Sequence, residues 1–417
     1  MRTWLAVRSM ALGAVVALAA CGRDAPDAVD VTFTAVVPPD APTVYLTGSA
    51  ESLGPWDPAG LAMEGDGPER TATLTLSAGE LFEYKFTLGS WDREGLGPSG
   101  TVMPNFELTP GTDTAVTQEI VDFKSDPVEY MADWPGSGVL GTLVYWQDVA
   151  SPRLQESRHV EIWLPPGYDE DEERRYPVIY MSDGQNLFDP RIANTGTDWG
   201  VDEAMMAGVE EGRHGPAIVV GVWNSSRRLQ EYSPWHEAPA YADFLLRELM
   251  PRIDAEFRTL EGPENTFHMG SSMGSLLSYY LVKEHPDAFG ACGCVSTHFP
   301  LAEDVVASIT GEDDPSLDDT PYVVRDIEAG ATVPPGARFF FDHGTEGLDA
   351  AYGPTHQRVR EWLSGQGLVE GEDFLIREYR GADHNESSWR ARIGDQLEWI
   401  LAGRAPAPPA SSGPLGP

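Results

Sequence analysis

Cysteine is scarce in this sequence, which has only three among 417 residues. Cys292 and Cys294 lie in a run, 289–296, that is typical of a strand. Residues two apart on a strand share a face but are too close along the chain for easy bridging. We therefore expect buried free thiols and no disulfide framework. The fold must be stabilised by its hydrophobic core, and the chain is long enough for two domains.

Positive charge is scarce as well. Lysine and arginine total 28 against 66 acidic residues, which gives a formal net charge of −38. Such a field repels nucleic acids and anionic membranes, so we expect neither as a partner. No apolar stretch beyond the N-terminal one approaches the length of a membrane span, so a lipid would be the only membrane anchor.

The N-terminal residues predict the compartment. Arg2 and Arg8 flank the start of an apolar run, 10–20, that ends in small residues directly before Cys21. This pattern is typical of a secretory signal peptide over residues 1–20. A cysteine after Leu-Ala-Ala resembles the bacterial lipobox, which implies an exported lipoprotein anchored through Cys21 at the periplasmic or cell surface. The alternative is an ordinary signal peptide with an incidental cysteine.

Composition divides the next part of the chain. Residues 21–30 form a short acidic tether. Short β-branched or aromatic runs separated by Pro, Gly and Asp then predict an antiparallel β-sandwich over 31–123. Its expected strands are 31–37, 43–47, 71–76 and 82–88. A linker rich in Asp, Pro and Gly follows at 124–140.

Residues 141–402 have a different hydrophobic pattern, in which segments typical of apolar strands alternate with segments typical of amphipathic helices. The expected strands are 159–164, 178–181, 217–223, 266–269, 289–296, 338–342 and 374–379. The expected helices include 202–211, 241–257, 273–285 and 389–401. This alternation predicts an α/β fold with a mostly parallel sheet covered on both faces. The tail 403–417, rich in Pro, Ala, Ser and Gly, is expected to be disordered.

Residues 270–274, Gly-Ser-Ser-Met-Gly, match the G-x-S-x-G pattern of a catalytic serine. A predicted strand precedes them, and a predicted helix follows that Pro286 ends. A strand-to-helix turn this tight needs glycines, lifts the serine hydroxyl out of the sheet and aims helix N–H groups at a developing oxyanion. We therefore expect Ser272 to be a nucleophile in an α/β-hydrolase fold. The alternative is a Gly-Ser loop that matches by chance.

A serine hydroxyl needs a base to take its proton. In this fold the base lies on the loop after the last strand, where His384 falls between 374–379 and the final helix. His298 follows an earlier strand and His343 occupies the expected position of the acid, so both are weaker candidates for the base. The alternative for His384 is a helix-capping or surface histidine.

The acid of the triad should follow the strand 338–342, in the order serine, acid, histidine. Asp342 is still on that strand, whereas Glu346 and Asp349 lie in the loop behind it. We favour Asp349 and keep Glu346 as the alternative, because reach depends on the geometry of the loop. The other carboxylate would be a solvated loop residue.

The second oxyanion donor should come from the loop after strand 178–181. Gly184 would let the backbone approach the substrate, and the Gln185 N–H would pair with the N–H of Met273. The alternative is a simple Asp-Gly turn.

By these motifs, roughly residues 141–401 resemble the putative esterase family, which includes enterochelin esterases, esterase D, feruloyl esterases and mycolyltransferases. The motifs that carry the resemblance are 180–186, Arg228 with 231–234, 270–274, 342–345, and His384 with Trp389. The resemblance implies acyl chemistry through an acyl-serine intermediate without metal or cofactor. Asp183 stands where many relatives carry the His of a His-Gly motif. Arg228 and Glu231 either shape the cleft or form a structural ion pair, and we favour the ion pair.

Residues 31–123 resemble starch-binding domains, the family-20 carbohydrate-binding modules. The resemblance rests on Leu-Gly-Pro-Trp at 53–56, Glu-Tyr-Lys at 83–85, and the Trp and Asn that follow. It implies that α-glucan is bound by Trp56, Lys85, Trp91 and Asn105, since aromatic rings stack on the apolar faces of sugars.

Two positions depart from the pattern of that family. Phe106 replaces the Arg that usually follows the Asn, and the usual Trp near 69–70 is missing. The alternative is therefore a domain that no longer binds sugar, in which Trp56 is a core residue and the domain is a spacer from the membrane.

Together these observations predict a serine carboxylic-ester hydrolase that acts through an acyl-enzyme. Its expected substrate is an acylated carbohydrate, of the feruloyl or acetyl ester type, at the cell envelope. One alternative is a siderophore-ester hydrolase or an acyltransferase of the same fold. Another is a non-catalytic carbohydrate-binding lipoprotein.

Overall fold

The structure is a computed structural model of the whole chain. It describes residues 28–54, 56–98, 102–103, 105–111, 115–124, 138–310 and 319–401. Cys21, the expected signal peptide and the expected tail lie outside these residues, so the lipoprotein expectation stays a prediction. No helix in the described part combines the length and the apolar character that a bilayer span requires.

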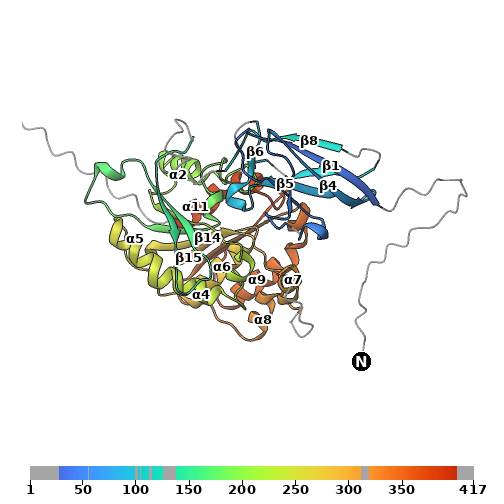
Figure 1. Cartoon of the computed structure of the whole chain (residues 1–417). Coiled ribbons are helices and arrows are strands. Elements are labelled where there is room, and N and C mark those ends of the chain that lie inside the picture. Colours follow the sequence, from blue (N-terminus) through green and yellow to red (C-terminus); the bar gives the residue numbers. More distant parts are fainter. Residues whose placement is uncertain are drawn as a thin grey trace, which may run out of the picture. The chain divides into compact units, whose positions relative to one another are not determined.

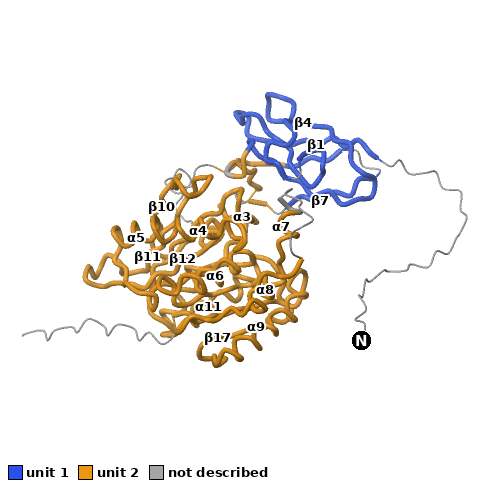
Figure 2. The backbone as a smooth tube through the Cα atoms, turned by 90° about the horizontal axis from the view of Figure 1, so that it is seen from below, with its two compact units in different colours: residues 1–89, 105–118 blue, residues 90–104, 119–417 orange. Residues whose placement is uncertain are grey.

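The chain forms two compact units (Figure 2). Within the described residues, the first unit contains 28–89 and 105–118, and the second contains 90–104 and 119–401. The expected first domain, 31–123, therefore differs from the first unit in two segments, 90–104 and 119–123, which belong to the second unit. Strand β6 (Gly95–Leu96) of the first segment pairs with β9 (Asp122–Phe123) of the second, and the Val102 carbonyl lies so close to Gly196 that a Cβ there would come within 2.1 Å.

The first unit is an antiparallel β domain, as the sequence predicts. One sheet has the order β4–β1–β8 and the other β3–β2–β5–β7. Their bounds are β1 (Ala28–Val36), β2 (Tyr45–Gly48), β3 (Leu61–Ala62), β4 (Glu69–Ser77), β5 (Phe82–Thr87), β7 (Phe106–Leu108) and β8 (Ala115–Glu119). Alternate residues of β4 are buried, because successive side chains of a strand point to opposite faces. The core is aromatic, with Phe33 against Tyr84 at 5.0 Å between ring centroids.

The second unit is built on one eight-stranded sheet (Figure 1). Its order is β10–β11–β13–β12–β14–β15–β16–β17; the pairs β10–β11 and β11–β13 are antiparallel, and the other five pairs are parallel. The bounds are β10 (Thr142–Val149), β11 (Arg158–Leu164), β12 (Val178–Ser182), β13 (Ile218–Val222), β14 (Thr266–Ser271), β15 (Ala291–Val295), β16 (Arg338–Gly344) and β17 (Phe374–Tyr379). This confirms the predicted mostly parallel sheet of an α/β-hydrolase fold.

Helices cover both faces of this sheet. Along β12, Val178 and Tyr180 pack with α6 on one face, whereas Ile179 and Met181 pack with α2 and α11 on the other. Burial on both faces explains why the parallel strands are continuously apolar. The helices are α2 (Val201–Glu210), α3 (Arg228–Glu231), α4 (Ala238–Phe244), α5 (Met250–Glu256), α6 (Met273–Glu284), α7 (Glu303–Thr310), α8 (Tyr322–Glu328), α9 (Gly353–Gly365), α10 (Glu386–Arg390) and α11 (Ile393–Leu401).

Two of the predicted helices are interrupted. The helix expected at 241–257 widens into a π-helical turn over Leu245–Leu249, between α4 and α5. Pro251 lies two residues after this turn and has no N–H to donate back into it, which accounts for the change in winding. The helix expected at 389–401 divides into α10 and α11.

A buried ion pair joins the start of β11 to α3. Both terminal nitrogens of Arg158 on β11 lie 2.8 Å from the carboxylate of Glu231, and the two side chains are 1% and 0% exposed. Removing one partner from such a pair leaves the other charge buried and uncompensated.

We therefore expect Glu231→Gln to lower the free energy of unfolding by about 3 kcal/mol. The matched control is Glu256→Gln on α5, whose partner Arg252 is 45% exposed; its effect should stay below about 0.5 kcal/mol. Urea denaturation of both variants measures the difference, and equal small effects would contradict the assignment.

Candidate active site

Ser272 stands on a sharp turn between β14 and α6. Its φ of 54° and ψ of −118° lie in a region that non-glycine residues rarely adopt. A Cβ on Gly270 would come within 2.6 Å of the Gly274 backbone, and one on Gly274 within 3.0 Å of the Ser182 side chain. Gly270 is therefore required for this turn, and a side chain at Gly274 would crowd Ser182; the turn holds the half-buried serine at the carboxyl end of the sheet.

Three predicted side chains meet at this turn. His384 Nε2 lies 2.9 Å from Ser272 Oγ, and His384 Nδ1 lies 2.6 Å from Asp349 Oδ1. His384 comes from the loop after β17, and Asp349 from a short 3-10 helix, η7 (Gly347–Ala351), that follows β16. The histidine side chain is 14% exposed and that of Asp349 is fully buried. The arrangement is a hydrogen-bonded chain from a hydroxyl through an imidazole to a buried carboxylate.

Asp349 is held as an anion by its hydrogen bonds. Its Oδ2 accepts bonds of 2.6 Å from both the Ser296 hydroxyl and the Gly344 N–H. Burial acts to raise its pKa, but the hydrogen bonds from His384, Ser296 and Gly344 outweigh burial and lower the pKa below its usual value. A negative charge therefore faces the imidazole at neutral pH.

The other two candidate acids do not contact His384. Glu346 is exposed, and its backbone N–H bonds to the Ala382 carbonyl. Asp342 is buried and accepts bonds from the Ser296 N–H, Arg392 and Gln396. It therefore supports the strand end, while Asp349 faces the histidine.

Sequence reasoning missed the groups that hold Asp349. Ser296 lies directly after β15, and its hydroxyl receives hydrogen bonds from Arg392 (2.6 Å) and from the Trp389 indole (2.9 Å). The available signal was a polar residue at the carboxyl end of an apolar strand, where active-site groups of parallel sheets gather.

The predicted oxyanion donors lie on two neighbouring elements. Met273 begins α6, and Gln185 lies in a 3-10 turn (Gly184–Asn186) that follows β12, the strand paired with β14. In the described part of the chain, neither N–H donates to a protein acceptor. A Cβ on Gly184 would come within 2.5 Å of the Gly221 backbone, so the turn requires glycine there.

Arg228 and Glu231 do not form the ion pair that the sequence suggested. Arg228 makes two bonds to Asp183, of 2.6 and 2.8 Å, while Glu231 pairs with Arg158. Each of these two α3 residues therefore pairs with a side chain from a strand end: Arg228 with Asp183, directly after β12, and Glu231 with Arg158, at the start of β11. Asp183, at φ 60°, thus holds the loop of Gln185 through Arg228 and through Asn224, which donates to it at 2.6 Å.

A second histidine lies beside the triad. The ring of His298 is 6.1 Å from that of His384 between centroids and 5.2 Å from that of Tyr352. The Tyr352 hydroxyl is hydrogen-bonded to His298 Nδ1. Thus His298, predicted only as a weaker candidate base, neighbours the imidazole without contacting Ser272.

The four predicted sugar-binding residues are distributed over both units. Trp56, Lys85 and Asn105 lie in the first unit and Trp91 in the second. Trp91 is 37% exposed, Lys85 is buried, and Asn105 donates to Glu83 at 3.2 Å. Trp56 is half-buried and has a φ of 60°.

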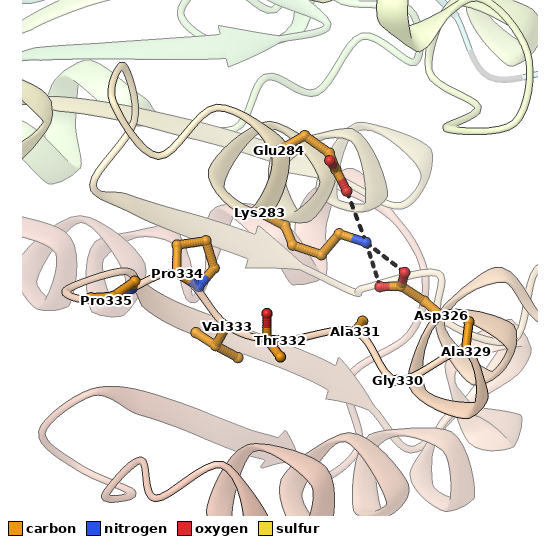
Figure 3. Close-up of a pocket in the computed structure, with 10 residues that line it drawn as sticks. All are labelled: Lys283, Glu284, Asp326, Ala329, Gly330, Ala331, Thr332, Val333, Pro334 and Pro335. Carbon is orange, nitrogen blue, oxygen red and sulfur yellow. Dashed lines mark hydrogen bonds and ion pairs between the residues drawn. The ribbon is translucent and has the colours of Figure 1, made fainter.

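A surface pocket of about 520 Å³ is lined in part by Lys283 and Glu284 (Figure 3). These two residues end α6, whereas Ser272 precedes its first residue. Lys283 points into the pocket and lies 2.6 Å from Asp326 Oδ1 and 3.0 Å from Glu284 Oε1. Two carboxylates thus compensate its one ammonium group. The pocket contains no member of the triad, so we assign the candidate chemistry to the other end of the helix.

Among the described residues, one acidic group has the spacing of metal ligands. Oxygens of Asp198, Asp202 and Glu203 lie within 4.8 Å of one another. Arg390 pairs with two of them, and burial raises the pKa of Asp202 to about 8. A guanidinium and a proton therefore balance this cluster.

Two families match separate parts of the chain. The model described as Starch binding domain matches residues 28–96, and the model described as Putative esterase matches residues 151–400. An Alpha-amylase of Niallia circulans is 42% identical over 88 residues, which are 20% of this chain and 7% of the amylase.

Proteins similar to the second unit include one of Bacillus subtilis (strain 168), Uncharacterized protein YbbA. It is 22% identical over 263 residues, 58% of this chain and 92% of that protein. Among solved structures, the ferulic acid esterase AmCE1/Fae1A of Anaeromyces mucronatus is 20% identical, covering 66% of this chain and 95% of its own, with a TM-score of 0.46. The enterobactin esterase FES of Shigella flexneri is 15% identical, covering 91% and 94%, with a TM-score of 0.49.

The esterase model covers more than half of the chain, and the fold and the G-x-S-x-G turn agree with it. The chain therefore belongs to the putative esterase family and carries a starch-binding domain before its esterase domain.

Proposed function

We propose that this protein is a serine carboxylic-ester hydrolase that acts through an acyl-enzyme intermediate. One observation carries the proposal: His384 bridges the hydroxyl of Ser272 and the buried carboxylate of Asp349. The family match supports ester chemistry in general, and this hydrogen-bonded chain gives it an activated nucleophile.

In the first half of the reaction, Ser272 Oγ attacks the ester carbonyl while His384 Nε2 accepts the hydroxyl proton. Asp349 accepts the proton on Nδ1 as a hydrogen bond, which fixes the imidazole tautomer and stabilises the imidazolium that forms. The N–H groups of Met273 and Gln185 are the proposed donors to the oxyanion of the tetrahedral intermediate. His384 then returns its proton to the leaving alcohol, and the acyl group remains on Ser272.

In the second half, water takes the place of the alcohol. His384 removes a proton from that water as its oxygen adds to the acyl carbonyl. His384 then gives this proton to Ser272 Oγ as the tetrahedral intermediate collapses, which releases the acid and restores the Ser272 hydroxyl.

We further propose an acylated carbohydrate as the substrate, of the feruloyl or acetyl ester type. The starch-binding domain supports this choice, because a module that retains polysaccharide would hold its attached esters near the second unit by effective concentration. The names of the solved relatives suggest esters of aromatic acids as the first substrates to test.

Replacing Ser272 by Ala should lower kcat on the order of 10⁶-fold, because the nucleophile is lost while binding is retained. The measurement is turnover of a panel of acetyl, feruloyl and catecholate-siderophore esters by a soluble form lacking Cys21.

Equal turnover by the wild type and by Ser272→Ala would overturn the mechanism. No turnover of any ester by the wild type would favour the non-catalytic carbohydrate-binding alternative.

Replacing Asp349 by Asn should lower kcat by about 10⁴-fold, because the amide favours the wrong imidazole tautomer. The matched control is Glu346→Gln in the same loop, whose exposed side chain should leave kcat within about twofold of wild type. Steady-state kinetics on the best ester of the panel decides between them. The reverse order of effects would assign the acid to Glu346.

Replacing Trp56 by Ala should reduce retention on amylose about tenfold, which corresponds to a lost stacking contact of about 1.4 kcal/mol. The control is Leu81→Ala, a 58% exposed apolar residue of the same unit that is not part of the family motif. Affinity electrophoresis in amylose measures both. A wild-type protein that migrates without retardation would make the first unit a spacer.

A further inference from the structure

His298 has an unusual position for a histidine outside the triad. It follows β15 at the same edge of the sheet as Ser272 and His384 and is half-buried. Its ring packs edge-on against those of His384 and Tyr352, at 74° and 85°. No step of the proposed reaction uses it.

The hydrogen bond from Tyr352 determines which ring nitrogen of His298 carries the proton. Tyr352 is 1% exposed, and its hydroxyl has His298 Nδ1 as its partner. A buried phenol donates its proton where an acceptor is available, so Nδ1 accepts and the ring proton resides on Nε2. Burial, with the charges of His384 and Arg228, lowers the pKa of His298 to about 4, which keeps the ring neutral.

The remaining donor of the ring, Nε2–H, is uncommitted. It has no hydrogen-bond partner in the described part of the chain, and it is not fully buried. An N–H group without a partner beside the triad is available to the substrate.

The surroundings of this N–H group are polar. Arg228 presents a side chain that is 26% exposed, and its charge acts on both His298 and Glu386. Glu386 in turn interacts electrostatically with Asp183 and His384. An apolar alcohol group would displace water from these polar groups without replacing its hydrogen bonds, whereas one bearing hydroxyls would replace them.

We infer that His298 is a specificity-determining residue for the alcohol part of the substrate. It donates from Nε2 to a hydroxyl oxygen that neighbours the ester oxygen, and Tyr352 is its positioning residue. The inference rests on the proposed function, in which His384 delivers a proton to the departing alcohol oxygen. Because the two ring centroids are 6.1 Å apart, His298 is near enough to bind an oxygen on the next carbon of a sugar ring while His384 serves the ester oxygen.

The test compares two esters of one acid, so that the acyl half of the reaction is constant. One is a monoacyl methyl glucoside with a free hydroxyl beside the ester, and the other is the ethyl ester. The measured quantity is the ratio of kcat/KM for the glucoside ester to kcat/KM for the ethyl ester. For His298→Leu we expect this ratio to fall about tenfold, the effect of one lost hydrogen bond.

Two further variants separate hydrogen bonding from packing. His298→Gln keeps an N–H donor and should restore most of the ratio, whereas Tyr352→Phe frees the tautomer and should lower the ratio about threefold. The control is His285→Leu at the opposite end of α6, which should keep the wild-type ratio.

The outcomes distinguish failure of the proposed function from failure of the inference about His298. Wild-type turnover that Ser272→Ala abolishes supports the proposed function, and a ratio lowered by His298→Leu and restored by His298→Gln supports the inference. A parallel loss on both esters, or an unchanged ratio, would overturn the inference alone. Wild-type protein that turns over neither ester would overturn both.

Discussion

The site depends on one buried carboxylate that must stay ionised. Asp349 is fully buried, and a charge in that position is costly unless hydrogen bonds replace its water. Ser296, the Gly344 N–H and His384 supply those bonds. Arg392 and Trp389 hold Ser296 in turn, so the ends of β15 and β16, α10 and the turn that follows α10 all act on the carboxylate of Asp349, directly or through Ser296.

The parallel sheet explains why these groups meet. Strands that run in the same direction end at the same edge, and the polar residues after β12, β14, β15, β16 and β17 therefore share one location. The packing of the apolar strands against the helices on both faces offsets the free-energy cost of the strained backbone at Ser272. The starch-binding domain has its own aromatic core around Phe33 and Tyr84, so each unit is stabilised separately.

Local patterns were sufficient for the sheet and for the elbow, because strand periodicity, glycine spacing and chain order are properties of short segments. The structure confirms the α/β fold that these patterns predict, but not every predicted side-chain contact. The choice between Asp349 and Glu346 depends on Ser296, which is 53 residues away from Asp349 along the chain. Similarly, the suggested Arg228–Glu231 pair was wrong because Asp183 and Arg158 approach from separate strands. Long-range contacts of this kind leave no periodic signal in a sequence.

The central claim is that Ser272 is activated by His384. Active-site labelling with a fluorophosphonate, followed by peptide mass spectrometry, tests it without assuming any substrate, because such reagents require an activated serine. We expect one adduct per chain, on the peptide that contains Ser272, formed at least tenfold more slowly in His384→Ala. An unlabelled protein, or an adduct on another serine, would contradict the account.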